Sequence, residues 1–350
     1  MNNKFKLSIK NLIENNKTIS NRIDFFQGAG GNVSAKVDEV EMVIKSSGVE
    51  IKEMSEHNGY SIVNYPNIQN YFMNLPEKIT KKIDEESVSH INNQLIDKPN
   101  YKSIRPSIET GFHSVLKKYV IHSHSVYVNI LACCDEFENL VNLIFRDDDY
   151  ITIKYSPPGT ILTKNILTKY QEYFKQHKKY PEIIFLQNHG LIVHSNDHLS
   201  CKKLHLHVNN LITDFFNINE AQYPKISLTR FSDSYFQSKN EFLVKFFKKH
   251  KQISPEYFNQ TLFPDQTVYF KNNITFKFSE HKKVKIGLEK IEYHANEKEA
   301  NTIEETLIAY VFIRTFIEDN NYKCSFLPEK QMDYIHNLES EKYRKKMLKK

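Results

Sequence analysis

The sequence predicts an α/β protein made of a larger and a smaller domain. Short apolar runs typical of strands alternate with amphipathic helical segments as far as about residue 217. A polar linker, NINEAQYPKIS, then precedes a second set of elements. With 350 residues and 40% hydrophobic content, the chain is long enough for two ordinary domains. We therefore expect one domain over residues 1–217 and a smaller α+β domain over 218–350.

The first elements are a helix and strands that flank two glycine-containing turns. Residues 4–16 carry apolar side chains at helical spacing, which predicts a helix covering a sheet. Gly28, Gly30 and Gly31 follow, and glycines let backbone amides approach an anion, although an ordinary hairpin turn explains them as well. Their spacing differs from the G-x-G-x-x-G dinucleotide fingerprint. The next strand turns at residues 46–48, a second corner of hydroxyl groups and glycine.

The middle of the first domain is predicted to contain a strand between two helices. Residues 64–100 are polar, with a helix near 79–96, and we assign them a structural role. A helix then begins at Pro106, followed by the strand YVIHSH and by a buried helix through residues 128–131.

Five further elements complete this domain. A strand over residues 150–156 leads into a helix over 161–174. The runs EIIFLQ and LIVH indicate two strands joined by a tight turn at residues 188–190, and a long helix over 197–216 follows.

The second part contributes no clear catalytic constellation. Asp265 and Arg344 are its candidates for structural or substrate contacts. Its expected elements are a helix near 234–250, strands over 267–271, 274–278 and 283–293, and helices near 297–319 and 328–348.

The composition limits the kinds of molecule that this protein is expected to bind. The chain has 48 basic and 42 acidic residues, a net charge of +6 that is spread along its length. This charge suits anionic small molecules and lacks the dense basic stripe of a nucleic-acid-binding protein. No apolar run approaches the roughly 18 residues needed to cross a membrane. The four cysteines show no paired spacing, so we expect reduced thiols in a cytoplasmic protein: Cys133, Cys134, Cys201 and Cys324.

A metal site is indicated by three histidines and a carboxylate. His122 and His124 have strand spacing, so both imidazoles point to one face of the sheet. His189 ends another apolar run beside a glycine, and Glu109 lies on the helix before the first pair. All four lie at the ends of elements, where functional groups reach a cleft. Together they predict a catalytic metal centre with an open position for substrate.

The other histidines of the chain must also be considered as possible metal ligands. Any one of the fifteen histidines alone is more often a structural residue than a ligand. His205 and His207 form a second His-x-His pair, but on a helix their side chains diverge by about 200°. We assign these two to packing or to the surface. His113 lies one helical turn from Glu109, on a shared face.

Five motifs together resemble the class II sugar-phosphate aldolase family, which includes pentulose-phosphate 4-epimerases and the adducin head domain. They are GAGGNVSAK, VIKSSGVEI, PSIETGFH, VIHSHSVYVNILA and LQNHGLIV, in the family's order and spacing over roughly residues 5–217. Segments 106–110, 264–269 and 339–344 also resemble the aldolase part of bifunctional rhamnulose-phosphate aldolase/lactaldehyde dehydrogenases.

The resemblance implies a fold, a site and an assembly. The fold is a three-layer α/β/α sandwich with a central, mainly antiparallel sheet, and the assembly is a homotetramer. His122, His124 and His189 correspond to ligands of one Zn²⁺ per chain, with Glu109 as the acid/base. A substrate phosphate would be held by Gly31, Asn32, Ser47, Gly48 and Ser107. Ile108 departs from the family pattern, where a second serine is common. Arg105 either replaces the lost contact with a fixed charge or lies on the surface.

These residues predict a zinc-dependent aldolase. The expected reaction cleaves or forms a ketose 1-phosphate through a metal-stabilised dihydroxyacetone phosphate enediolate. A sugar-phosphate 4-epimerase or dehydratase using the same site is an alternative. So is a non-catalytic, adducin-like assembly module, although such a module has no need of three converging histidines.

Overall fold

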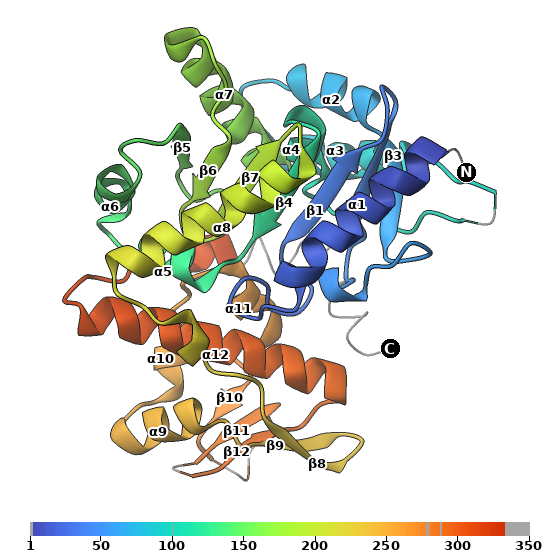
Figure 1. Cartoon of the computed structure of the whole chain (residues 1–350). Helices are drawn as coiled ribbons and strands as arrows, with labels where there is room; N and C mark the ends of the chain where they lie inside the picture. Colours follow the sequence, from blue (N-terminus) through green and yellow to red (C-terminus); the bar gives the residue numbers. More distant parts are fainter. Residues whose placement is uncertain (1–2, 100, 278, 280, 288, 333–350) are drawn as a thin grey trace.

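The central sheet of the protein has seven strands and lies between two layers of helices (Figure 1). The structure is a computed structural model and describes residues 3–99, 101–277, 279, 281–287 and 289–332. Neighbouring strands are antiparallel except for the β5–β6 pair. In sheet order the strands are β3 (Tyr60–Asn64), β2 (Glu41–Lys45), β1 (Asn32–Lys36), β4 (Tyr119–Ser123), β7 (Gly190–Ser195), β6 (Ile183–Leu186) and β5 (Tyr150–Ile153). The mainly antiparallel α/β/α sandwich is confirmed.

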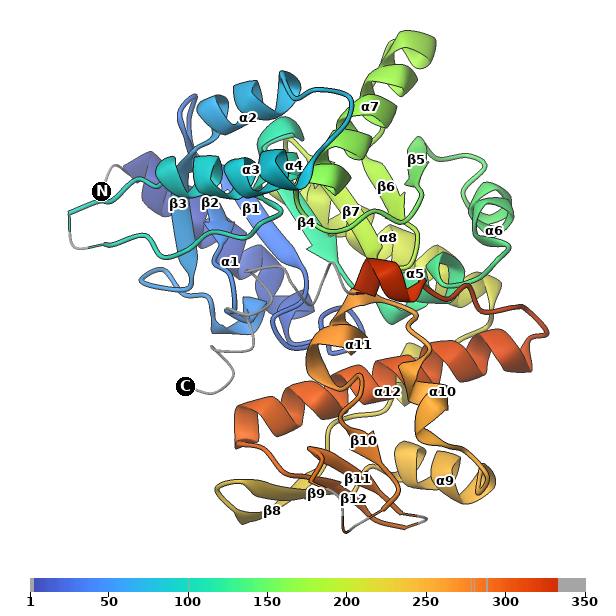
Figure 2. The ribbon, with the colours of Figure 1, turned by 180° about the vertical axis from the view of Figure 1, so that it is seen from behind.

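Both faces of this sheet are apolar. Successive side chains along a strand point to opposite faces, and these strands carry apolar residues at successive positions. On β4, Val120 belongs to one buried cluster and Ile121 to another. Figure 2 shows the second helical layer from behind. The first layer contains α1 (Asn3–Ser20), α5 (Val126–Ala132) and α8 (His198–Phe215); the second contains α2 (Tyr65–Met73), α3 (Lys81–Asn93), α4 (Thr110–Val115) and α7 (Thr160–His177).

Most predicted elements of the first part are confirmed, with four differences, of which the first is that strand β3 was not predicted. The helix expected from Pro106 begins only at Thr110, and Glu109 occupies its N-cap position. The polar segment 64–100 contains α2 as well as α3; Asn64 caps α2 by accepting a hydrogen bond from the Asn67 amide. A short helix, α6 (Phe137–Ile144), was not predicted.

The C-terminal part contains a second sheet and a long buried helix. Helix α12 (Glu297–Asp319) lies between the two sheets in both views (Figures 1 and 2). Buried residues lie on every side of this helix between Ala300 and Val311, which is typical of a helix inside a protein. The five strands, in sheet order, are β10 (Ile274–Thr275), β11 (Val284–Ile286), β12 (Ile291–Tyr293), β9 (Tyr235–Ser238) and β8 (Leu228–Ser232). Three shorter helices are α9 (Glu241–Lys249), α10 (Pro255–Asn259) and α11 (Pro264–Tyr269).

Three predictions for this part were wrong in detail. The strand expected over 267–271 overlaps the end of α11, because Pro264 at the first helical position presets the helix and tertiary packing overrides the β-propensity of TVYF. Residues 234–250 were expected to form one helix but form strand β9 and then helix α9. Asn240 caps the start of α9. The single strand expected over 283–293 is the hairpin β11–β12.

The helix at 297–319 is confirmed as α12. Most of the helix expected near 328–348 lies outside the described residues, as does Arg344. One hydrophobic cluster includes residues of both parts, such as Leu131 and Ile308, so the division at residue 217 stays a prediction. Within the described residues, no helix has the length and apolar character required for a membrane span.

Candidate metal centre

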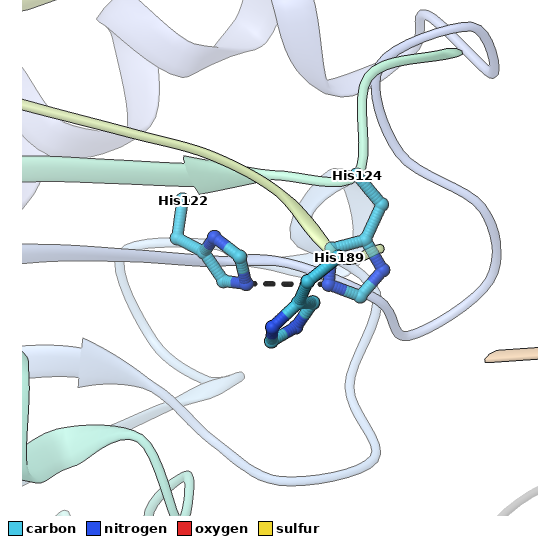
Figure 3. A group of neighbouring side chains, drawn as sticks. All are labelled: His122, His124 and His189. Carbon is cyan, nitrogen blue, oxygen red and sulfur yellow. Dashed lines mark hydrogen bonds between the residues drawn. The ribbon is translucent and has the colours of Figure 1, made fainter. Parts of the chain in front are cut away.

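Three buried histidines converge at one end of the central strands (Figure 3). Their ligand atoms lie within 4.8 Å of one another, and the Nε2 atoms of His122 and His124 are 3.2 Å apart. The side chains are 0%, 6% and 3% exposed for His122, His124 and His189. This is the three-histidine group that the sequence predicted.

Strand register explains why residues so distant in sequence meet. His122 lies opposite Ile192 in the antiparallel β4–β7 pair, and the end of β4 therefore lies beside the start of β7. His124 follows β4 directly, and His189 directly precedes β7. The strands thus bring the two segments to the same edge of the sheet. His122 also lies opposite Asn32 on β1, which places the first glycine corner at this edge.

Hydrogen bonds orient two of the imidazole rings. The Nδ1–H of His122 donates to the Leu191 carbonyl at 3.0 Å, and the Nδ1–H of His124 donates to Asp265 Oδ2 at 2.5 Å. We assign these tautomers from the partners, since both accept only. The Nε2 lone pairs of both rings are therefore directed at the point where the histidines meet, an arrangement typical of metal ligands.

Burial keeps the His122 imidazole neutral. Burial lowers the pKa of His122 well below its usual 6.5, and the neighbouring His189 and His124 lower this pKa further. A neutral imidazole is the form that binds a metal ion. At neutral pH the site therefore has no proton to lose from His122 before a cation enters.

Glu109 faces the histidines. Its Oε2 lies 3.6 Å from His122 Nε2, and its Oε1 lies 3.6 Å from His189 Nε2. Asn32 Nδ2 donates to Glu109 Oε2 at 2.6 Å. The carboxylate is 5% exposed, so it is held in a fixed orientation beside the point where the Nε2 atoms meet.

A cleft with an empty volume of about 490 Å³ opens beside this group. Its lining includes Glu109, His124 and His189 together with five of the six residues predicted to hold a phosphate: Gly31, Asn32, Ser47, Gly48 and Ser107. Both glycine corners thus border the same space as the histidines. Geometry supports the predicted grouping, while the roles of these residues remain predictions.

Arg105, the sixth predicted residue, is absent from the described residues that line the cleft. Its carbonyl accepts a hydrogen bond from the Ser47 amide at 2.9 Å, which ties the second corner to the segment before Glu109. Ile108 does line the cleft. Where the family pattern has a hydroxyl group, this chain therefore presents an apolar side chain.

Lys45 is a cleft residue that the sequence reasoning missed. It is 2% exposed, and its Nζ donates to the carbonyls of Ala29 at 3.1 Å and Val49 at 2.7 Å. Lys45 is the last residue of β2, directly before the Ser46-Ser47-Gly48 turn, and a lysine at a strand end gives no sequence signal of burial. Its ammonium group adds positive charge between the two corners.

Three histidines outside this group have other partners. His113 is buried at hydrogen-bond distance, 2.7 Å, from Ser34 Oγ, and burial lowers its pKa to about 3. His205 packs against Phe25 and lies 2.8 Å from Ser123 Oγ. His207 is exposed and pairs with Asp148. Assigning His205 and His207 to packing and to the surface is confirmed.

Gly190 permits a close approach between the two histidine segments. A Cβ at this position would lie 2.2 Å from the Ser123 carbonyl oxygen. Gly190→Ala is therefore expected to lower the free energy of unfolding by about 1–3 kcal/mol through overpacking. Urea denaturation measures this loss, with Ser195→Ala on the same strand as a control. An unfolding free energy equal to that of the wild type would contradict the packing argument.

The sandwich and its buried histidine group belong to a known family of proteins. The sequence matches the family described as Class II Aldolase and Adducin N-terminal domain over residues 11–213, which is more than half of the chain. The protein therefore belongs to the class II aldolase and adducin family. Comparison with curated proteins found no match.

The chain is similar to solved structures from several organisms. The chain is similar to the N-terminal class II aldolase domain of a conserved protein from Thermoplasma acidophilum, at 22% identity and a TM-score of 0.49, over 59% of this chain and 93% of that chain. A sugar-phosphate aldolase from Thermotoga maritima matches at 12% identity and a TM-score of 0.41, over 61% and 94%. An L-fuculose 1-phosphate aldolase from Glaciozyma antarctica PI12 matches at 10% and 0.40, over 91% and 92%.

The donor set fits the divalent metal that class II aldolases use. His122, His124 and His189 offer three nitrogen ligands in one buried space, and Glu109 lies at its border. Three protein ligands beside a cleft leave room for a substrate oxygen, as catalytic metal sites require.

Proposed function

We propose that the protein is a zinc-dependent aldolase that cleaves, or in reverse forms, a ketose 1-phosphate. The observation that carries this proposal is the convergence of three histidine Nε2 atoms and Glu109 beside a cleft bordered by two glycine corners. When bound, the divalent ion supplies Lewis-acid stabilisation of the negative charge that develops on the substrate's carbonyl and hydroxyl oxygens.

Glu109 is the proposed acid/base. In the cleavage direction the hydroxyl group on the departing carbon loses its proton and becomes the aldehyde as the C–C bond breaks. Glu109 accepts this proton and delivers it to the carbon left behind, which yields dihydroxyacetone phosphate. In the reverse direction it removes that proton. Its hydrogen bond from Asn32 and its burial support this role, because a positioned and desolvated carboxylate transfers protons effectively.

The two corners are proposed to bind the substrate phosphate. Gly31 and Gly48 allow backbone amides to approach the phosphate, while Ser47 and Ser107 offer hydroxyl donors. Asn32 and the ammonium group of Lys45 border the same space. These groups would place the phosphate at one end of the cleft and the reacting carbons beside Glu109.

Ser47→Ala tests this assignment. The substitution is expected to raise KM for a ketose 1-phosphate about tenfold, equal to about 1.4 kcal/mol, since a hydrogen bond to a charged phosphate is lost. Because Ser47 lies away from the reacting carbons, kcat should change little. Steady-state kinetics measures both, with the exposed Ser89→Ala as a control. An unchanged KM would remove Ser47 from the phosphate site.

Sequence likeness supports a relationship between this protein and the aldolase part of the bifunctional rhamnulose-phosphate aldolase/lactaldehyde dehydrogenases. Two of the three segments that carry this likeness are described: 106–110 contains Glu109, and 264–269 is helix α11. The third, 339–344, lies outside the described residues. A homotetramer in the cytoplasm remains part of the proposal, and light scattering would measure the assembly.

Product analysis tests the reaction type. The purified, zinc-loaded protein is incubated with a panel of ketose phosphates, and products are identified by mass spectrometry. Triose phosphate supports the aldolase. An isomer of unchanged mass would indicate a 4-epimerase, and a loss of water a dehydratase. Absence of bound metal together with binding to a protein partner would favour an assembly module.

A further inference from the structure

Two of the three histidine segments are held by residues from outside the family match at 11–213. Asp265 Oδ2 accepts the hydrogen bond from His124 Nδ1, and the carboxylate is 1% exposed. The Leu262 carbonyl accepts a hydrogen bond from Asn188 Nδ2 at 2.9 Å, directly before His189. Residues of the C-terminal part thus contact the site from one short segment, 262–265.

This segment is itself firmly placed. Gln266 accepts from the Leu262 amide at 2.9 Å and donates to the carbonyls of Phe258 at 2.7 Å and Gln260 at 3.0 Å. Helix α11 packs against the buried helix α12. Asp265 is therefore positioned by a packed helix, with a backbone that the surrounding hydrogen bonds hold in place.

The pair formed by His124 and Asp265 also occupies the space above Gly30. A Cβ at position 30 would lie 2.6 Å from Asp265 Oδ2 and 2.8 Å from His124 Nδ1. Residue 30 is therefore best occupied by glycine, because any side chain there would push this pair apart. The first glycine corner and the C-terminal segment fit together around one hydrogen bond.

The bond is on the side of the imidazole opposite to the metal-binding nitrogen. With Nδ1–H donated to a carboxylate, His124 presents Nε2 as its ligand atom, 3.2 Å from His122 Nε2. A carboxylate in this position fixes both the tautomer and the direction of the ring, and it raises the basicity of the ligating nitrogen. Asp265 thus acts on the metal centre through His124 and does not belong to the ligand group.

We propose that Asp265 is a positioning residue of the metal centre, so that the C-terminal part completes a site whose ligands all lie in the family domain. This inference rests on the proposed function, because it requires that the histidines bind a metal ion. It assigns a role to the C-terminal part that the ligand set alone does not show.

The test is metal affinity in Asp265→Asn and Asp265→Ala, measured with Zn²⁺ in competition with a chromophoric chelator. Both variants are expected to bind Zn²⁺ about 10–100-fold more weakly than the wild type, the range typical for loss of such a partner. The visible spectrum of the Co²⁺-loaded protein should change as well, because Asp265→Ala removes the acceptor that orients the His124 ring and Asp265→Asn replaces a charged acceptor with a neutral one. Asp233→Asn, an exposed aspartate of the same part, is the control.

Circular dichroism of the metal-free Asp265→Asn protein separates folding from ligand positioning. If this variant does not fold, Gly30→Ala replaces it, since the added methyl separates the pair while leaving the carboxylate present; a tenfold or greater loss of Zn²⁺ affinity is again expected. If the folded variant binds Zn²⁺ with wild-type affinity and its Co²⁺ spectrum is unchanged, the role of Asp265 is contradicted while the proposed function stands. A wild-type protein that binds no metal would overturn the proposed function instead.

Discussion

Replacing His122 with alanine is expected to remove the bound metal ion and to abolish aldolase activity. His122 is fully buried, and its Nε2 atom is close to both His124 and Glu109. Two remaining histidines leave the site one ligand short of the three that catalytic zinc centres use. Metal analysis of purified protein should give about one zinc ion per wild-type chain and almost none in the variant.

His194→Ala is a matched control for this experiment. His194 is also fully buried in the central sheet, but it lies near Tyr170 on α7 and does not belong to the group of three histidines. Its loss should lower stability without removing zinc. A His122→Ala protein that retains both zinc and activity would disprove the assignment of the metal site.

Glu109→Gln is expected to lower kcat by roughly 10²–10⁴-fold, the usual contribution of a positioned acid or base. The amide keeps an oxygen that accepts the hydrogen bond from Asn32, so the shape of the site is preserved. It cannot transfer a proton, and the chemical step therefore fails while substrate and metal still bind.

Two measurements accompany this prediction. Zinc content should equal that of the wild type, and KM should change much less than kcat. Turnover within about threefold of the wild type would show that Glu109 is not the acid/base.

The histidine group was predictable because its signals are local. His122 and His124 share a strand face by spacing alone, and His189 precedes a glycine at the end of an apolar run. The sequence could not give the strand order, yet β4 and β7 had to be neighbours for these histidines to meet. The family resemblance implied that the three histidines are ligands of one metal ion, without giving the strand order.

The contact of Asp265 with the site could not be predicted from local sequence patterns. Its segment has strong β-propensity, so a strand was predicted directly after it, whereas Pro264 and packing against α12 produce a helix. Contact with His124 depends on that helix and on a sequence separation of 141 residues. Lys45 was missed for a related reason, since a lysine in a strand is usually exposed and its burial becomes visible only in the folded structure.

Hydrogen exchange into dihydroxyacetone phosphate tests the central claim most directly, because it needs no knowledge of the aldehyde. The zinc-loaded protein is incubated with dihydroxyacetone phosphate in D₂O, and the mass of the recovered triose phosphate is measured. Incorporation of one deuteron at the hydroxymethyl carbon is expected in the wild type, with loss of exchange after chelation and in Glu109→Gln. A zinc-loaded wild-type protein that leaves the mass unchanged would contradict the proposed mechanism.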